Sequence, residues 1–143
     1  MPYRMFLWCF ILWLLTACGM QSAPQAVSSD GAAQAVSSDG AAQTGLALVT
    51  AFAGWDEPTI ARVIIADETS AIRLAATRDL WSRWISLRLG AFTTATVQQA
   101  TTTGDTATLT IESIHAQGSG FTDLTLERLD GQWRVRTWNS YRP

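Results

Sequence analysis

The spacing of apolar residues changes once along this chain, at Gly90, and that change constrains the fold more than any other feature. Before Gly90, apolar residues recur every three or four positions, which is typical of helices with one buried face. After Gly90, threonine and β-branched residues dominate and apolar residues alternate with polar ones, which is typical of half-buried strands. Helices followed by antiparallel strands predict an α+β domain with the helices on one face of the sheet.

Three helices are expected in the first part of this domain. The first runs from Thr44, which can cap a helix, to Gly54. The second begins at Pro58, which suits a first helical turn, and ends near Ile65. A longer helix over Ala71–Leu89 is expected to turn one stripe toward the core; its members are Ile72, Ala76, Leu80, Trp84 and Leu87, with Trp81 and Ile85 widening it.

Four strands are expected after the helices, at Ala91–Ala100, Thr106–His115, Phe121–Leu129 and Trp133–Trp138. Glycine-containing turns separate them, and Asp130-Gly131 is the signal of a two-residue hairpin. Short connections between successive strands predict an antiparallel meander. The expected fold is therefore three helices packed on a curved, cone-like, four-stranded antiparallel sheet.

This order of elements, closed by the segment LERLDGQWRVRTW (Leu126–Trp138), resembles the nuclear-transport-factor-2-like (NTF2-like), or cystatin-like, superfamily that includes the SnoaL-like proteins. The resemblance covers about Thr44–Tyr141 and implies a cone-shaped domain. Superfamily members include enzymes such as ketosteroid isomerase, scytalone dehydratase and SnoaL-like cyclases, and also domains that bind or assemble without catalysis. The resemblance leaves both kinds of function open.

Near the start of the chain, Arg4 precedes an apolar run over Met5–Leu15, and the small residues Thr16 and Ala17 follow before Cys18. This is the three-part layout of a secretory signal. Eleven apolar residues span only about 16 Å of helix, roughly half of a bilayer core. We therefore expect a leader that is removed rather than a permanent membrane helix.

Leu15-Thr16-Ala17-Cys18 resembles the lipobox of bacterial lipoproteins. The resemblance implies cleavage between Ala17 and Cys18, a diacylglyceryl group on the Cys18 sulfur, and acylation of the new amino terminus. Two or three acyl chains would hold the protein stably in a membrane, whereas one would not. Gly19, where an aspartate is associated with inner-membrane retention, favours the outer membrane or outer surface of the cell envelope. The alternative is an ordinary signal peptide that is cut elsewhere.

Small and polar residues fill the chain from Gly19 to Gln43, and the nonapeptide QAVSSDGAA occurs twice in succession, at Gln25–Ala33 and Gln34–Ala42. So few apolar side chains cannot offset the entropy of ordering the backbone, so we expect a disordered linker. The predicted organisation is a signal peptide at 1–17, a lipidated cysteine and linker at 18–43, and an α+β domain at 44–143.

Composition limits the chemistry that the folded domain can perform. Cys9 and Cys18 are the only thiols, and His115 is the only histidine. A disulfide or thiolate site is therefore not expected in the domain, and a transition metal would have to rely on carboxylates. We expect no metal and no cofactor. A net charge of −2 with scattered arginines also argues against a nucleic-acid partner.

No catalytic residue is assigned from the sequence. His115 ends a strand and could act as a base beside Asp67, Asp79 or Asp123, but the simpler interpretation is an exposed histidine at a loop edge. An isomerase would also need a tyrosine donor. Tyr141 is the only tyrosine after the leader, and it lies beyond the last predicted strand.

The tryptophans have two expected roles. Trp84 and Trp133 fall on faces that are expected to turn inward, so we expect both to fill the core. Alternation along the last strand places Trp138 on the opposite face, together with Arg134 and Arg136. That arrangement predicts a stacked contact surface.

The expected function is that of a lipid-anchored envelope protein whose domain binds an envelope protein or a small apolar ligand without catalysis. One alternative is a small-molecule enzyme of the ketosteroid isomerase or SnoaL-like type, with its pocket inside the cone. Another is a structural accessory subunit of an envelope complex. The space between the long helix and the sheet separates the first two, because an enzyme needs it open and lined by His115 and a carboxylate.

Overall fold

The computed structural model of this protein describes residues 29–142. The predicted signal peptide, Cys18 and the start of the predicted linker lie outside these residues. The helical half comprises α1 (Ser29–Gly54), α2 (Glu57–Val63), α3 (Glu68–Asp79), the π-helical segment η1 (Leu80–Ile85) and α4 (Ser86–Leu89). No helix within the described range is long and apolar enough to span a membrane.

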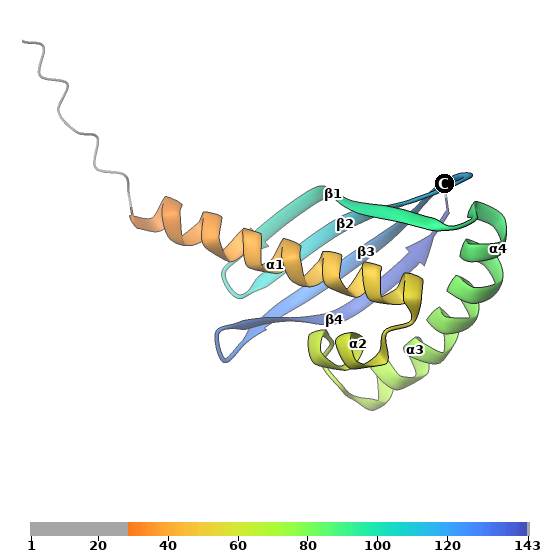
Figure 1. The fold of residues 1–143 in the computed structure, drawn as a ribbon. Coiled ribbons are helices and arrows are strands. Elements are labelled where there is room, and N and C mark those ends of the chain that lie inside the picture. Colours follow the sequence, from red (N-terminus) through yellow and green to blue (C-terminus); the bar gives the residue numbers. More distant parts are fainter. Residues whose placement is uncertain (1–28, 143) are drawn as a thin grey trace, which may run out of the picture.

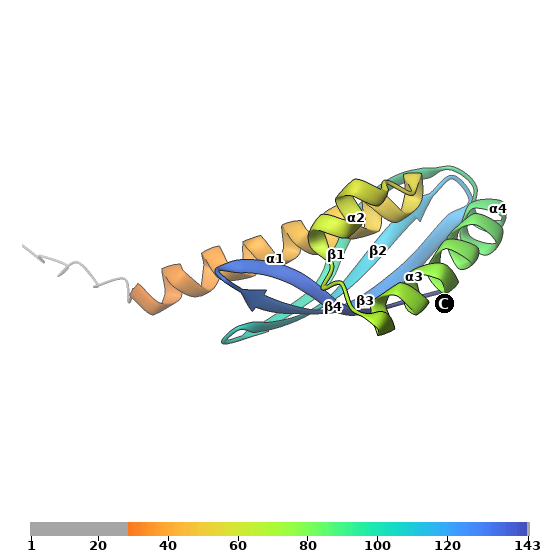
Figure 2. The same cartoon turned by 90° about the horizontal axis from the view of Figure 1, so that it is seen from below.

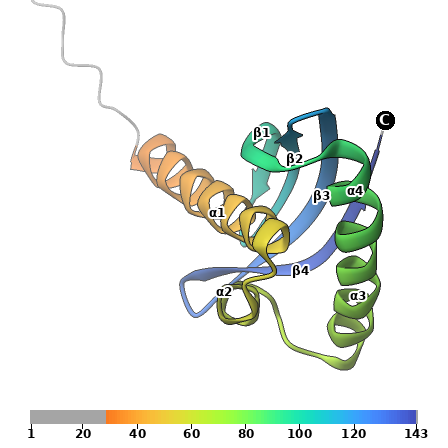
Figure 3. The same cartoon turned by 45° about the vertical axis from the view of Figure 1, so that its right-hand side comes forward.

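The strand half forms one antiparallel sheet in the order β1-β2-β3-β4. Its strands are β1 (Phe92–Thr103), β2 (Thr106–His115), β3 (Gly118–Leu129) and β4 (Gln132–Tyr141). In Figure 1, α1 runs along the sheet, and Figure 3 shows how the sheet curves around it. The chain continues from α3 through η1 into α4, and α3 lies beside β4 (Figures 1 and 2). The predicted fold class is confirmed.

The hairpin between β3 and β4 forms where the sequence predicted it. Leu129 pairs with Gln132 across the two-residue turn. Asp130 and Gly131 both have positive φ, 51° and 78°, as the turn type that matches strand twist requires. The alternation on β2 is also as predicted, with Leu109 and Ile111 buried against the helices.

α1 begins earlier than the boundary that we placed at Thr44. Ala41 is fully buried, and a Cβ on Gly45 would lie only 2.7 to 2.9 Å from Leu109, Ile111 and Leu124. Glycine at position 45 therefore lets the helix backbone approach the sheet closely. Gly40 and Ala41, at the end of the second copy of the nonapeptide, belong to this helix and lie close to the sheet, a contact that a composition argument misses.

Capping residues define where α2 and α3 begin. Asp56 accepts a hydrogen bond from the Thr59 amide at 3.3 Å, and Asp67 accepts one from the Ser70 amide at 2.7 Å. Ser70 in turn accepts from the Asp67 amide at 2.9 Å, which completes a capping box. α3 therefore starts at Glu68, ahead of the predicted Ala71.

The long helix turns a different face to the core from the one predicted. Trp81, Ile85 and Leu89 are buried, whereas Ile72, Trp84 and Leu87 are 69, 56 and 76% exposed. Both sides of this helix are apolar, so spacing alone does not choose between them. η1 is a π-helical segment, which is wound more loosely than an α-helix, and its Trp81 and Ile85 are buried.

The predicted face of Trp138 is also wrong. Val135 pairs with Leu126 and Thr137 with Thr125, so Arg136 is the extra residue of a β-bulge. The bulge reverses the alternation beyond it. Trp138 consequently joins Trp133 and Val135 on the buried face, only 2% exposed, instead of sharing a surface with the arginines.

Candidate functional site

Aromatic side chains fill the space between the long helix and the sheet. The ring centroids of Trp81 and Trp138 lie 5.9 and 6.0 Å from that of Phe52. The Trp138 indole donates to Thr77 at 2.8 Å, and the Trp81 indole donates to Ser140 at 3.3 Å. The polar atoms of both indoles are therefore satisfied within the core, as buried groups require. The interior predicted for an enzyme pocket is packed.

The two tryptophans predicted to fill the core differ in outcome. Trp133 is 8% exposed and packs beneath α1, where a Cβ on Gly40 would lie 3.1 Å from its ring. Trp84 lies on the solvent side of η1, with the Arg88 guanidinium 5.3 Å from its ring centroid. Only Trp133 belongs to the core.

His115 is buried, so the expectation of an exposed loop-edge histidine is wrong. Its Nδ1 lies 3.2 Å from the Gly90 carbonyl oxygen and its Nε2 lies 3.2 Å from the Ser113 hydroxyl. Its ring packs against Trp81 and Phe92, with centroids 5.9 and 5.6 Å apart. These contacts tie the end of β2 to the turn after α4, which is a structural role.

The aspartates considered as partners of His115 are engaged elsewhere. Asp67 caps α3, and Asp79 pairs with Arg83 at 2.5 Å on the helix surface. Asp123 accepts a hydrogen bond from Thr110 at 2.8 Å. The structure therefore does not assemble a histidine–carboxylate pair from these residues.

An apolar groove of about 560 Å³ lies between α2 and α3. Its volume falls within the roughly 300 to 1,000 Å³ that is usual for small-molecule sites. Buried Ile60 and Ile64 contribute from the α2 side and half-buried Leu74 from the α3 side. Figure 3 shows the two helices standing apart on either side of their connection. Apart from Trp55, the remaining apolar side chains that line the groove are small, namely Ala61, Ala66, Ala71 and Ala75.

Three side chains from different elements meet at the rim of this groove. The Trp55 indole donates to a Glu57 carboxylate oxygen at 3.2 Å, and Arg78 lies 3.6 Å from that oxygen. The Arg78 guanidinium also lies 5.3 Å from the Trp55 ring centroid. Trp55 has a φ of 51°, which is rare for a residue with a large side chain. The rim therefore places charged groups and a flat aromatic surface beside an apolar floor.

Arg136 joins the sheet to the start of α3 near the other end of the groove. It donates to both carboxylate oxygens of Glu127, at 3.0 and 2.7 Å, and lies 3.5 Å from Asp67. The hydrogen bonds from Arg136 lower the pKa of Glu127. Arg134 donates instead to the backbone carbonyl of Arg62 on α2. The two arginines that were predicted to form a surface with Trp138 thus connect β4 to the helical half.

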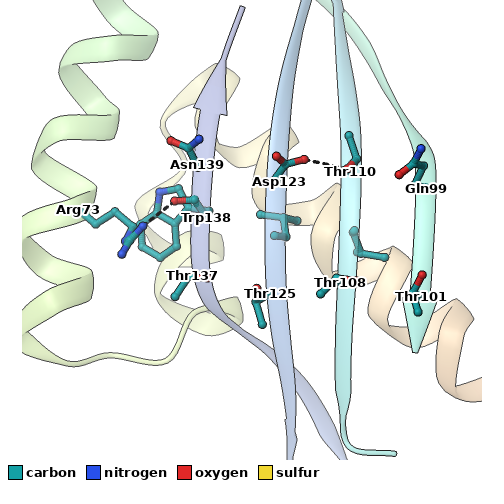
Figure 4. Close-up of a pocket in the computed structure, with 12 residues that line it drawn as sticks. Arg73, Gln99, Thr101, Thr108, Thr110, Asp123, Thr125, Thr137, Trp138 and Asn139 are labelled. Carbon is teal, nitrogen blue, oxygen red and sulfur yellow. Dashed lines mark hydrogen bonds between the residues drawn. The ribbon is translucent and has the colours of Figure 1, made fainter. Parts of the chain in front are cut away.

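A second hollow, of about 340 Å³, lies on the face of the sheet away from α1 (Figure 4). Two polar rows cross the four strands there. One row is Thr101, Thr108, Thr125 and Thr137, and the other is Gln99, Thr110, Asp123 and Asn139. One polar, solvated face is usual for an antiparallel sheet whose other face is packed.

Tyr141 lies on this same outer face, away from the apolar groove. Its hydroxyl donates to Asp123 at 3.5 Å, and its ring stacks on Phe121 with centroids 6.0 Å apart. Desolvation, together with the neighbouring Asp123 carboxylate, raises the pKa of the Tyr141 hydroxyl. This tyrosine and aspartate do not face an enclosed pocket of the kind that an isomerase uses.

Potential metal ligands are dispersed. Across residues 29–142, no group of three or more histidine, cysteine, aspartate or glutamate side chains is placed to hold a metal ion. The sequence patterns did not point to the groove residues Trp55, Ile60 and Arg78. A usable signal was present in the alanines of α2 and α3 that line the groove, because small residues leave space between helices.

Comparison with known proteins identifies the fold. No family model and no curated protein matches this chain. A candidate NTF2-like transpeptidase from Campylobacter jejuni has a similar structure, with a TM-score of 0.54 and 13% sequence identity over 66% of this chain and 95% of that one. An NTF2-like protein of unknown function from Silicibacter pomeroyi matches with a TM-score of 0.49 and 15% identity, covering 76% of this chain and 98% of the other. The first similarity shows an NTF2-like fold and, at such low identity, the fold alone.

Proposed function

We propose that this protein is exported, is anchored in a membrane of the cell envelope by acyl chains on Cys18, and binds a small apolar molecule without covalent chemistry. The observation that carries the binding proposal is the groove between α2 and α3, which has an apolar floor, alanine walls and the dimensions of a ligand site. The lipobox Leu15-Thr16-Ala17-Cys18 supports the anchor. Gly19 supports the outer membrane or outer surface as its location.

The nature of the groove indicates the class of ligand. Ile60, Ile64 and Leu74 offer contacts to a hydrocarbon, whereas Arg78 and Glu57 lie at the rim, where a polar end would emerge. A single acyl chain or a molecule of similar shape fits this arrangement. An enzymatic alternative finds less support, because His115 is buried among Gly90, Ser113 and aromatic rings.

A photoreactive long-chain fatty acid tests the binding proposal. Membranes that carry the full chain are incubated with the probe and irradiated, and the labelled peptides are identified by mass spectrometry. We expect labelling to concentrate within residues 57–78. Ala71→Phe fills the groove and should abolish that labelling, whereas Ser82→Phe adds the same side chain to an exposed helix position outside it. Equal labelling of both variants would reject the groove as the site.

Substitution of Cys18 tests the anchor separately. Cys18→Ser should remove incorporation of radioactive palmitate and release or mislocalise the protein, while its far-ultraviolet circular dichroism stays unchanged. Retention of both label and membrane association in this variant would refute lipidation at Cys18. Ser22→Cys in the Cys18→Ser background is a useful control, because it restores a thiol but not the lipobox.

A further inference from the structure

The solvent side of the long helix carries a continuous apolar row. We define the outer stripe as Ile72, Ala76, Leu80, Trp84 and Leu87, spread over α3, η1 and α4. Ile72, Trp84 and Leu87 are 69, 56 and 76% exposed, and Ala76 is exposed as well. Their spacing is that of a buried helix face, yet among the described residues only Leu80 is half-buried against the core, and the other four members of the stripe are exposed. A large unpartnered apolar face of this kind marks an interaction surface.

We propose that the outer stripe binds the outer stripe of a second copy of this chain, with the two helices antiparallel. Positions along the helix make the stripe self-complementary about Leu80. Ile72 and Ala76 lie about 12 and 6 Å before Leu80, while Trp84 and Leu87 lie about 5 and 9 Å after it, because the π-helical segment rises less per residue than an α-helix. Antiparallel pairing therefore sets the large Trp84 against the small Ala76, and Leu87 against Ile72, with Leu80 meeting its own copy at the two-fold axis.

Charge favours the same arrangement. Arg88, which stacks on Trp84, lies about 8 Å along the axis from Glu68 in the first turn of the other helix, a distance that the two extended side chains can span. Arg83 is already paired with Asp79 on its own helix and adds no unbalanced charge. Parallel pairing would instead oppose Trp84 to Trp84 and Arg88 to Arg88. Bulk and like charge both disfavour that alternative.

The position of the stripe argues against a membrane as its occupant. α1 begins at the end of the domain opposite α4 in every view (Figures 1 to 3). A tether that enters at α1 thus does not press the stripe against a bilayer. One helix pair buries less than the roughly 800 Å² per partner of a standard interface, so we expect a weak, concentration-dependent dimer. Confinement of the chain to a membrane would raise the local concentration and favour it.

Cysteine cross-linking in the full-length chain tests the pairing. Cys9 and Cys18 are first changed to serine, so that each added thiol is the only one in the chain. Two copies that differ in tag length, one with Ile72→Cys and one with Leu87→Cys, are produced together, purified and oxidised at high concentration in solution, because Cys18→Ser is expected to release the chain from the membrane. We expect a mixed disulfide dimer, with little self-dimer of either variant. Leu80→Cys should give an efficient self-dimer.

Ser82→Cys is the matched control, because Ser82 is exposed on the same helix but lies off the stripe. Yields for Ser82→Cys that equal those of the stripe variants would overturn the proposal. Efficient self-dimers of Ile72→Cys would overturn the antiparallel arrangement. These results do not depend on the lipid anchor or on the groove.

Sedimentation equilibrium of the detergent-solubilised, otherwise native chain gives a second measurement. Trp84→Ala removes the central aromatic anchor and should raise the dimer dissociation constant about tenfold or more. Because Trp84 is mostly exposed, the melting temperature of the domain should stay close to that of the native chain. The proposal would be refuted if the native chain stayed monomeric at all concentrations, or if Trp84→Ala left the dimer dissociation constant unchanged. Binding of the monomer to anionic vesicles, if Trp84→Ala abolished it, would show that lipid occupies the stripe and would also refute the proposal.

Discussion

The packed interior and the α2–α3 groove are both apolar, yet one is closed and the other open. In the interior, Phe52, Trp81 and Trp138 fill the volume between the long helix and the sheet. In the groove, alanines from α2, α3 and their connection line the hollow, and about 560 Å³ stays unfilled. Side-chain size, rather than hydrophobicity, therefore decides where this fold leaves space unfilled.

The largest effect is expected where a substitution opens the packed interior. Trp81→Ala removes a side chain that is 2% exposed and that contacts both Phe52 and His115. The lost contacts and the remaining cavity should destabilise the domain by about 3 to 5 kcal/mol. Urea unfolding followed by far-ultraviolet circular dichroism measures the change. A loss below about 1 kcal/mol would mean that the interior is not the main source of stability.

Removing a single polar atom from the interior is expected to have a smaller effect. Thr77→Val keeps the shape of the side chain but leaves the Trp138 indole without its acceptor at 2.8 Å. An unsatisfied buried donor should cost about 1 to 3 kcal/mol. The double variant Thr77→Val/Trp138→Phe removes donor and acceptor together. If Thr77→Val lowers the stability of the Trp138→Phe variant as much as it lowers that of the native chain, loss of the hydrogen bond is not the cause.

The rim of the groove should be less sensitive than the interior. Trp55→Ala removes the stack on Phe52 and the contact with Arg78, which should cost about 1 kcal/mol. Trp55→Gly removes the same side chain but accepts the φ of 51° more readily, so it should be the more stable of the two by about 1 kcal/mol. Thermal unfolding of both variants provides the test. Equal stabilities would show that the backbone at this rim is not strained.

The smallest effect is expected where Arg136 binds Glu127 near the groove. The pKa of Glu127 is lowered in the folded state, so its ionised form stabilises the fold above the pKa of the unfolded chain. This contribution is lost as pH falls through the lowered folded pKa. Melting temperatures between pH 7 and pH 3 should therefore converge for the native chain and Glu127→Gln. A constant difference at all pH values would contradict the assigned role.

Local sequence patterns correctly predicted the strand half of the fold. The alternation around Leu109 and Ile111, and the Asp130-Gly131 turn, predicted β2 and the β3–β4 hairpin because side chains on a strand alternate with a period of two. The resemblance to the NTF2-like superfamily, drawn from the order of elements, is confirmed for the fold. Lipidation of Cys18 and the location of the protein remain predictions that the Cys18→Ser experiment tests.

The candidate site was much harder to predict from the sequence. Its walls, α2 and α3, meet only after the chain has turned between them, and none of its residues belongs to a chemical motif. His115 was expected to be exposed because it ends a strand. Its burial depends on Trp81, more than thirty positions away, and on the turn at Gly90.

Local sequence patterns were enough to predict the order of helices and strands, the tight hairpin and the apolar character of both sides of the long helix. Tertiary structure alone decided which side is buried, since Ile72, Trp84 and Leu87 follow a helical period as well as Trp81, Ile85 and Leu89 do. It also decided the face of Trp138, through the bulge at Arg136. Periodicity is a property of one segment, whereas burial depends on which second segment comes to pack against it.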